Sequence, residues 1–156
     1  MTFRKLLLAA VLACFTAPLA IAQSDPDVSA GSRVPRLADI MSALQQRHLK
    51  LYFAARAQNW ELADFELRQV RAGLSEAAML YSGLPVTNIT TLGTPVQALF
   101  DATKAKDERK FMDAFGQLTN GCNACHQSMD RSFIVIAQPT GQQPFTNQVF
   151  APATKK

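Results

Sequence analysis

The sequence is poor in side chains that form disulfides or bind metal ions, with three cysteines and two histidines among 156 residues. One cysteine, Cys14, falls in an apolar leader, and the two that remain are too few for a disulfide-stabilised scaffold. A structural zinc ion needs four ligands. The two remaining cysteines and the two histidines, His48 and His126, are the whole supply of Cys and His outside the leader. Structural zinc is therefore disfavoured.

Long runs of one residue type are also missing. No apolar run beyond the leader approaches the roughly 20 residues that a membrane-spanning helix requires. Long basic runs are absent, as is the interleaving of aromatic and basic residues that binds single-stranded nucleic acid. No nucleophile and base stand at a recognisable catalytic spacing. We therefore expect no membrane span, no nucleic-acid partner and no enzymatic activity of its own.

Residues 1–22 have the pattern of a secretory signal peptide. Two basic residues precede an apolar run over 6–17, and a small-x-small cleavage site follows at 20–22. Cleavage there leaves 134 of the 156 residues, enough for one domain. A lipoprotein signal that leaves Cys14 as a lipidated N-terminus is the alternative, and the short apolar stretch before Cys14 disfavours it.

The other two cysteines belong to one short motif, Cys122-Asn123-Ala124-Cys125-His126. In this C-x-x-C-H spacing, two thiols can add across the vinyl groups of haem while the adjacent imidazole ligates the iron. A thioredoxin-type dithiol pair would follow a strand, whereas the apolar residues over 111–125 recur at helical spacing. The motif predicts one covalently attached haem c.

Apolar residues recur at intervals of three and four within 36–131, which is typical of amphipathic helices. Asn59 and Asp107 are expected N-caps, and Thr94-Pro95 is the expected start of a short third helix after a linker rich in Thr, Gly and Asn. The expected helices cover 36–58, 59–82, 94–105 and 107–131. Helices with short links predict an all-α fold, an antiparallel four-helix bundle.

Irregular segments are expected on both sides of the bundle. Residues 23–35 are rich in Ser, Asp, Gly and Pro and predict a flexible lead-in. Residues 132–156 begin with an apolar run, Phe133 to Ile136, and continue with prolines that forbid another long helix. We expect an extended, Pro-containing C-terminal tail that packs on the bundle, either as a cap on the core or as a shield for a haem edge.

With four helices and C-x-x-C-H on the last one, the chain resembles the class II cytochromes c, the cytochrome c′-like bundle family, over about 36–131. Class I cytochromes c match poorly, because their motif lies near the mature N-terminus and their axial methionine far downstream, whereas here only Met129 follows. The resemblance implies that Cys122 and Cys125 form the thioether links and that His126 is the proximal iron ligand. The long Pro-containing tail departs from typical cytochromes c′ and indicates a separate branch.

The sixth iron position has two candidates. In an antiparallel bundle, the second half of the last helix lies near the first half of the first helix, where Met41 and His48 share one face. A buried histidine needs a polar partner, which iron would supply, while a methionine there fits an apolar core equally well. We favour His48 as the distal ligand, with Met41 as the alternative. A distal hydrogen-bonding role for His48 and a five-coordinate iron stay open.

Together these features predict an exported, periplasmic monohaem cytochrome c that carries single electrons between redox partner proteins. The first alternative is a haem protein that binds diatomic gases at an open or displaceable sixth position. The second is a haem-carrying accessory subunit of a larger exported oxidoreductase. The sequence also leaves a homodimer open.

Overall fold

The computed structural model describes residues 34–141 and 148–153. The predicted signal peptide over 1–22, which includes Cys14, and residues 23–33 of the predicted lead-in lie outside the described residues. The described part of the chain contains four helices and no strand, which confirms the all-α prediction. The helices are α1 (Leu37–Arg56), α2 (Trp60–Leu80), α3 (Val86–Ala105) and α4 (Glu108–Ser128).

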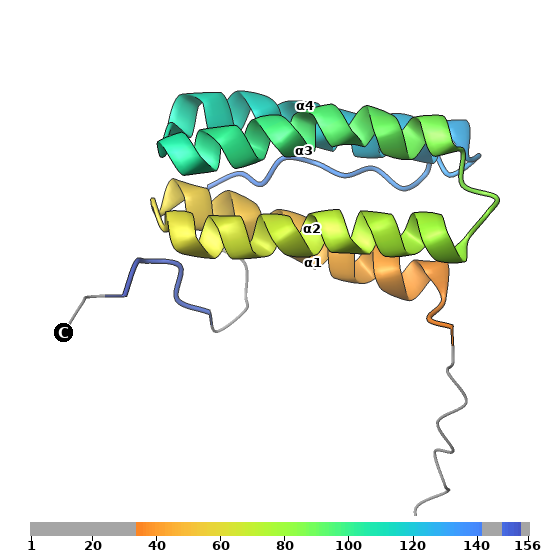
Figure 1. The fold of residues 1–156 in the computed structure, drawn as a ribbon, viewed down its shortest axis with the longest axis horizontal. Helices are drawn as coiled ribbons and strands as arrows, with labels where there is room; N and C mark the ends of the chain where they lie inside the picture. Colours follow the sequence, from red (N-terminus) through yellow and green to blue (C-terminus); the bar gives the residue numbers. More distant parts are fainter. Residues whose placement is uncertain (1–33, 142–147, 154–156) are drawn as a thin grey trace, which may run out of the picture. The chain divides into compact units, whose positions relative to one another are not determined.

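The four helices pack as an antiparallel bundle, with α1 beside α2 and α3 beside α4 (Figure 1). Short connections reverse the chain between consecutive helices, so each helix packs against the one before it. Helix α2 also contacts α3, whereas α1 and α4 contact each other much less. The seam between α1 and α4 is therefore the least closed side of the bundle.

The expected caps at two helix starts are confirmed. The Asn59 side chain accepts a hydrogen bond from the backbone N–H of Leu62 (3.1 Å), and that of Asp107 accepts from the N–H of Lys110 (3.0 Å). Each bond satisfies one of the backbone donors that a helix leaves unpaired in its first turn. Because the caps stabilise helix starts directly after the preceding helices end, the connections before α2 and α4 are short.

Helix α3 is longer than predicted. It begins at Val86 rather than near Thr94-Pro95, so the expected linker over 83–93 is mostly helical and Pro95 lies inside the helix. A proline there lacks the N–H that an interior helical residue donates. Burial compensates: Leu92 is packed so closely against α4 that a Cβ at Gly121 would lie 2.6 Å from its Cδ2 atom. Tertiary packing has overridden the local start signal at Thr94-Pro95.

Aromatic residues dominate the core in the half of the bundle nearest the α1–α2 and α3–α4 turns. Phe111 and Phe115 of α4 are fully buried, and their ring centroids lie 6.3 Å apart in a stacked arrangement. Trp60 packs edge-on against Phe111 at 6.1 Å. Large buried rings of this kind contribute strongly to stability, so this half is the well-packed part of the bundle.

The tail runs back along the bundle, but its apolar run does not pack as predicted. After α4 the chain runs back along the bundle between α1 and α4 (Figure 1). There the Gln138 side chain lies so close to α4 that a Cβ at Gly116 would be 2.7 Å from its Nε2 atom. Phe133 and Val135 remain 77% and 73% exposed. Among the described residues of the tail, Phe150 enters the core and is 1% exposed. The aromatic ring of Phe150 finds a core site, whereas the backbone of the apolar run is held by polar contacts.

Candidate functional site

The C-x-x-C-H motif lies on the last turns of α4, in continuous helix from Glu108 to Ser128. Cys122 and Cys125 are therefore separated by about one helical turn. Both are free thiols and both are half-buried. The helical setting differs from the strand-to-helix context of a thioredoxin-type pair, so the two thiols stand where a ligand beside α4 can meet both.

The two thiols have different surroundings. Cys122 packs against the hydrophobic core, and this burial, together with the charge of Cys125, raises the pKa of its thiol to about 11. The Cys125 sulfur instead accepts a hydrogen bond from the Asn88 side chain of α3 (3.7 Å), which also donates to the Ser128 hydroxyl (2.7 Å). Cys122 is thus a neutral thiol near pH 7, and Cys125 is held by a polar contact across the α3–α4 interface.

The His126 ring is oriented by the tail. Its Nδ1 atom lies 2.9 Å from the backbone carbonyl oxygen of Ile134. A carbonyl oxygen only accepts, so Nδ1 carries the hydrogen and Nε2 keeps its lone pair. Metal-binding histidines commonly have this arrangement, in which one nitrogen donates to a carbonyl and the other ligates. His126 is therefore in the tautomer that iron ligation through Nε2 requires.

His48 is buried in the core of the bundle, 6% exposed. Its Nε2 lies 2.8 Å from the Thr119 hydroxyl, which donates its own hydrogen to the Phe115 carbonyl (2.9 Å). Nε2–H of His48 is therefore the donor. Burial lowers the pKa of His48 to about 4, so the ring is neutral near pH 7. The polar partner that a buried imidazole requires is therefore Thr119.

Helix geometry sets the level of each candidate ligand along the bundle. His48 of α1 lies opposite Thr119 of α4. Met41 precedes His48 by seven residues and His126 follows Thr119 by seven, which is close to two turns, or about 10 Å, in each helix. Because α1 and α4 are antiparallel, these displacements have the same direction. Met41, which is half-buried, therefore shares the level of His126, whereas His48 lies about two turns away.

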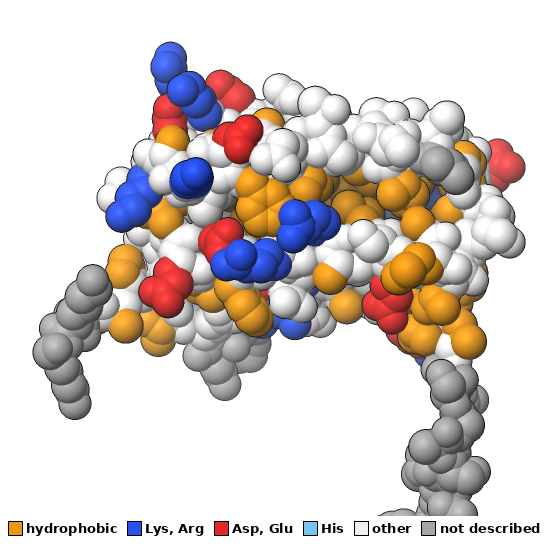
Figure 2. All heavy atoms as spheres, in the orientation of Figure 1, with side chains coloured by type: hydrophobic (Ala, Val, Ile, Leu, Met, Phe, Trp, Pro, Cys, Tyr) orange, Lys and Arg blue, Asp and Glu red, His pale blue; other side chains and the backbone are white. Residues whose placement is uncertain are grey.

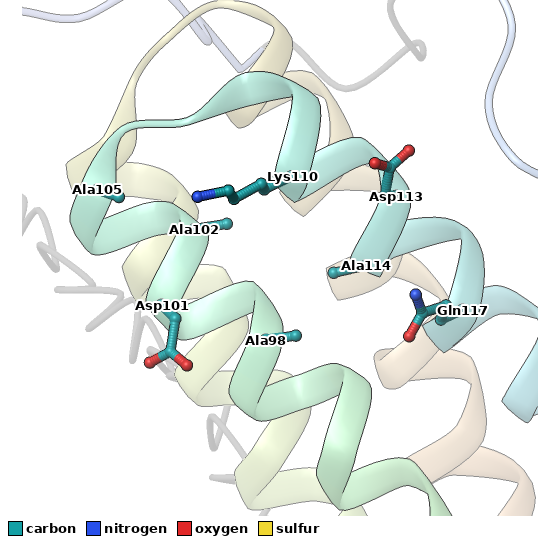
Figure 3. A pocket seen from close by; sticks show the side chains of 8 residues that line it. All are labelled: Ala98, Asp101, Ala102, Ala105, Lys110, Asp113, Ala114 and Gln117. Carbon is teal, nitrogen blue, oxygen red and sulfur yellow. The ribbon is translucent and has the colours of Figure 1, made fainter.

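Two hollows lie away from the motif. A groove of about 330 Å³ between α3 and α4 has a floor of alanines, and the side chains of Asp101, Lys110, Asp113 and Gln117 stand at its edges (Figure 3). A furrow between α2 and α3 shows apolar side chains along its length, with charged ones gathered toward the end where α2 begins (Figure 2). No Cys or His side chain lines the groove between α3 and α4.

Nothing in the described part of the chain gathers three His, Cys, Asp or Glu side chains as a metal-ion site does. The donor set on α4 instead fits a group that takes two thiols and one imidazole, since the thiols are free and Nε2 of His126 has a lone pair. No helix within residues 34–141 is long and apolar enough to cross a membrane.

In comparisons with known proteins, the chain matches no protein-family model, no curated protein and no solved structure. The site therefore has to be interpreted from its own residues. Two contacts of the motif with the tail backbone were not predicted, those of Asn123 with Ile136 and of His126 with Ile134. For the Asn123 contact, the sequence offers one signal, which is the asparagine itself inside the motif.

Proposed function

We propose that the protein is an exported monohaem cytochrome c that carries single electrons through a haem attached at Cys122 and Cys125. The observation that carries the proposal is the state of the motif: two free thiols one turn apart, beside an imidazole whose Nε2 lone pair is available. The resemblance to the class II cytochromes c supports it. When bound, haem supplies the one-electron change of its iron.

The chain's residues have separate roles in this proposal. Cys122 and Cys125 hold the group through thioether bonds, and His126 ligates through Nε2. The Ile134 carbonyl fixes the orientation of the His126 ring (2.9 Å). Apolar neighbours of Cys122 in the core exclude water from that side, and exclusion of water is one of the means by which a protein sets a haem potential.

For the sixth iron position, the levels along the bundle favour Met41 over His48. His48 lies about two turns from the level of His126, and Thr119 holds its ring in the core through the Nε2–H. Met41 lies at the level of His126 and is half-buried. Methionine ligation raises the potential relative to histidine. A methionine-ligated iron would therefore suit a carrier that accepts electrons readily.

Export to the periplasm, exchange of electrons with periplasmic redox proteins and the lack of a catalytic activity of its own complete the proposal. The signal-peptide pattern over 1–22 supports the first of these.

The test is to mature the full chain with the haem c attachment machinery and record its optical spectra and potential. We expect a low-spin spectrum and a reversible one-electron titration. Met41→Leu should remove the sulfur-to-iron band of the oxidised protein, whereas the matched change Met112→Leu, in a half-buried methionine of α4, should leave it. His48→Gln should also keep the low-spin spectrum. Loss of that spectrum in His48→Gln alone would make His48 the ligand.

A second function, binding of diatomic gases, is favoured by one contact. Because Thr119 holds His48 about two turns from the level of His126, that ring does not stand beside the motif, and without Met41 ligation the sixth position is open. Titration of the ferrous protein with carbon monoxide separates the two functions. Rapid binding with a high-spin starting spectrum would support gas binding, and no binding at saturating gas would exclude it.

A further inference from the structure

Three hydrogen bonds fix the tail segment after α4 to the C-x-x-C-H motif. The Asn123 side chain donates through Nδ2 to the Ile136 carbonyl (2.8 Å) and accepts through Oδ1 from the Ile136 N–H (2.8 Å). Two residues earlier in the tail, the Ile134 carbonyl accepts from Nδ1 of His126 (2.9 Å). One amide thus satisfies both backbone groups of one tail residue, as a neighbouring strand would.

Packing of side chains does not explain how this segment is held. Phe133, Ile134 and Val135 are 77%, 42% and 73% exposed. Exposed apolar side chains contribute little burial energy, because that energy scales with the area removed from water. Backbone bonds hold the turn before the segment, from the Arg131 N–H to the His126 carbonyl (2.8 Å) and from the Ile134 N–H to the Arg131 carbonyl (2.9 Å). The two Asn123 bonds hold the segment beside α4 on the other side of Ile134, and so help to place the Ile134 carbonyl.

We infer that Asn123 is a positioning residue for His126: it holds the tail so that the Ile134 carbonyl accepts the Nδ1–H of the proximal histidine. The inference deepens the proposed function and rests on it for the identity of the metal. A carbonyl that accepts the Nδ1–H fixes the tautomer and the ring orientation and makes Nε2 a stronger electron-pair donor to iron. A stronger electron-pair donor stabilises ferric relative to ferrous iron. The hydrogen bond from His126 to Ile134 therefore lowers the midpoint potential.

The experiment compares the midpoint potential and the Ile136 amide exchange of the haem-loaded wild-type chain with those of the haem-loaded Asn123→Ala variant. Loss of such partners typically changes metal-site properties about tenfold or more. A tenfold shift of the ferric–ferrous equilibrium toward ferrous iron raises the midpoint potential by about 59 mV for one electron. Hydrogen exchange of the Ile136 amide should become about fivefold faster or more as its bond is lost. Covalent haem content, measured separately, should not change.

Two further variants control for position and for maturation. Ala124→Ser alters the exposed neighbouring position of the motif, which has no tail contact among the described bonds, and should leave the potential and the Ile136 exchange unchanged. Ile136→Pro removes the N–H that Asn123 accepts while leaving C-x-x-C-H intact. It should raise the potential in the same direction as Asn123→Ala, and it keeps the test available if that variant fails to mature.

In the haem-loaded protein, either of two results overturns the inference. One is unchanged Ile136 exchange in Asn123→Ala, and the other is faster exchange with a potential equal to that of Ala124→Ser. If the wild-type chain takes no covalent haem, the proposed function fails. The positioning of His126 by Asn123 is then tested in the haem-free chain. There, nitrogen chemical shifts of the His126 ring should show the Nδ1–H tautomer in the wild type and a shift toward Nε2–H in Asn123→Ala. Equal tautomer populations would overturn it.

Discussion

The two histidines of the chain lie in regions of opposite character. His48 lies in the packed middle of the bundle, 4.3 Å from the Phe115 ring centroid and bonded to Thr119. His126 lies at the half-exposed end of α4, bonded to a tail carbonyl. His48 donates its Nε2–H to a hydroxyl inside the core. His126 donates its Nδ1–H to the tail backbone, and its Nε2 keeps a lone pair beside the two thiols.

The difference shows that the place at which a ring is held, more than its burial, determines whether it can take part in a metal site at the motif. Thr119 holds the His48 ring in the core, about two turns from the level of His126. His126 is less buried, yet its hydrogen bond prepares the opposite nitrogen for ligation. The packed region is therefore expected to govern stability, and the motif region to govern redox behaviour.

The largest expected effect comes from truncating the ring beside His48. Phe115→Ala removes a fully buried ring that contacts His48, Tyr52 and Phe111, and should lower the free energy of unfolding by about 3–5 kcal/mol. The matched change Phe133→Ala, in the exposed apolar run of the tail, should cost less than about 0.5 kcal/mol. Urea unfolding of both variants gives the comparison, and similar losses would contradict the division into two regions.

Acid should destabilise the His48 region. The folded-state pKa of His48 is about 4, below its ordinary value of 6.5, so between these pH values only the unfolded chain binds the proton. Stability is full above pH 6.5 and falls as the pH drops toward 4, by about 3 kcal/mol in all. Urea unfolding at pH 7 and pH 4.5 measures this loss. His48→Gln should lack this contribution, and an equal loss in that variant would assign it to other groups.

Removing the partner of His48 should have a smaller effect. Thr119→Val keeps the shape of the side chain but leaves the His48 Nε2–H unpaired, at an expected cost of about 1–3 kcal/mol. Thr103→Val is the matched control, because the buried Thr103 hydroxyl has no hydrogen-bond partner. That change should be neutral or stabilising. Chemical unfolding distinguishes the variants, and equal costs would mean that the Thr119 bond contributes nothing.

Much of the bundle could be predicted because its signals are local. The apolar spacing over 36–131 gave four helices, and Asn59 and Asp107 cap helices where predicted. The start of α3 could not be predicted, because Thr94-Pro95 is a strong local start signal and only the contact of Leu92 with α4 outweighs it. The prediction that the apolar run of the tail packs on the bundle was wrong for a related reason. Backbone contacts that cannot be recognised in the sequence hold this run at the surface.

The site divides in the same way. The C-x-x-C-H spacing of Cys122, Cys125 and His126 can be recognised in the sequence by itself, and the attachment of haem there stays a prediction. The hydrogen bonds that decide how each imidazole is used join residues 71 and 8 positions apart, His48 with Thr119 and His126 with Ile134. A sequence pattern shows that a buried histidine needs a partner but does not identify a threonine on another helix as that partner.

The most direct test of the account is the mass of the denatured full chain after expression with the haem c attachment machinery. The wild type should retain the added mass of one haem under denaturing conditions, and the double variant Cys122→Ala/Cys125→Ala should not. A wild-type chain that carries only the mass of its polypeptide would contradict the central claim that this motif attaches haem.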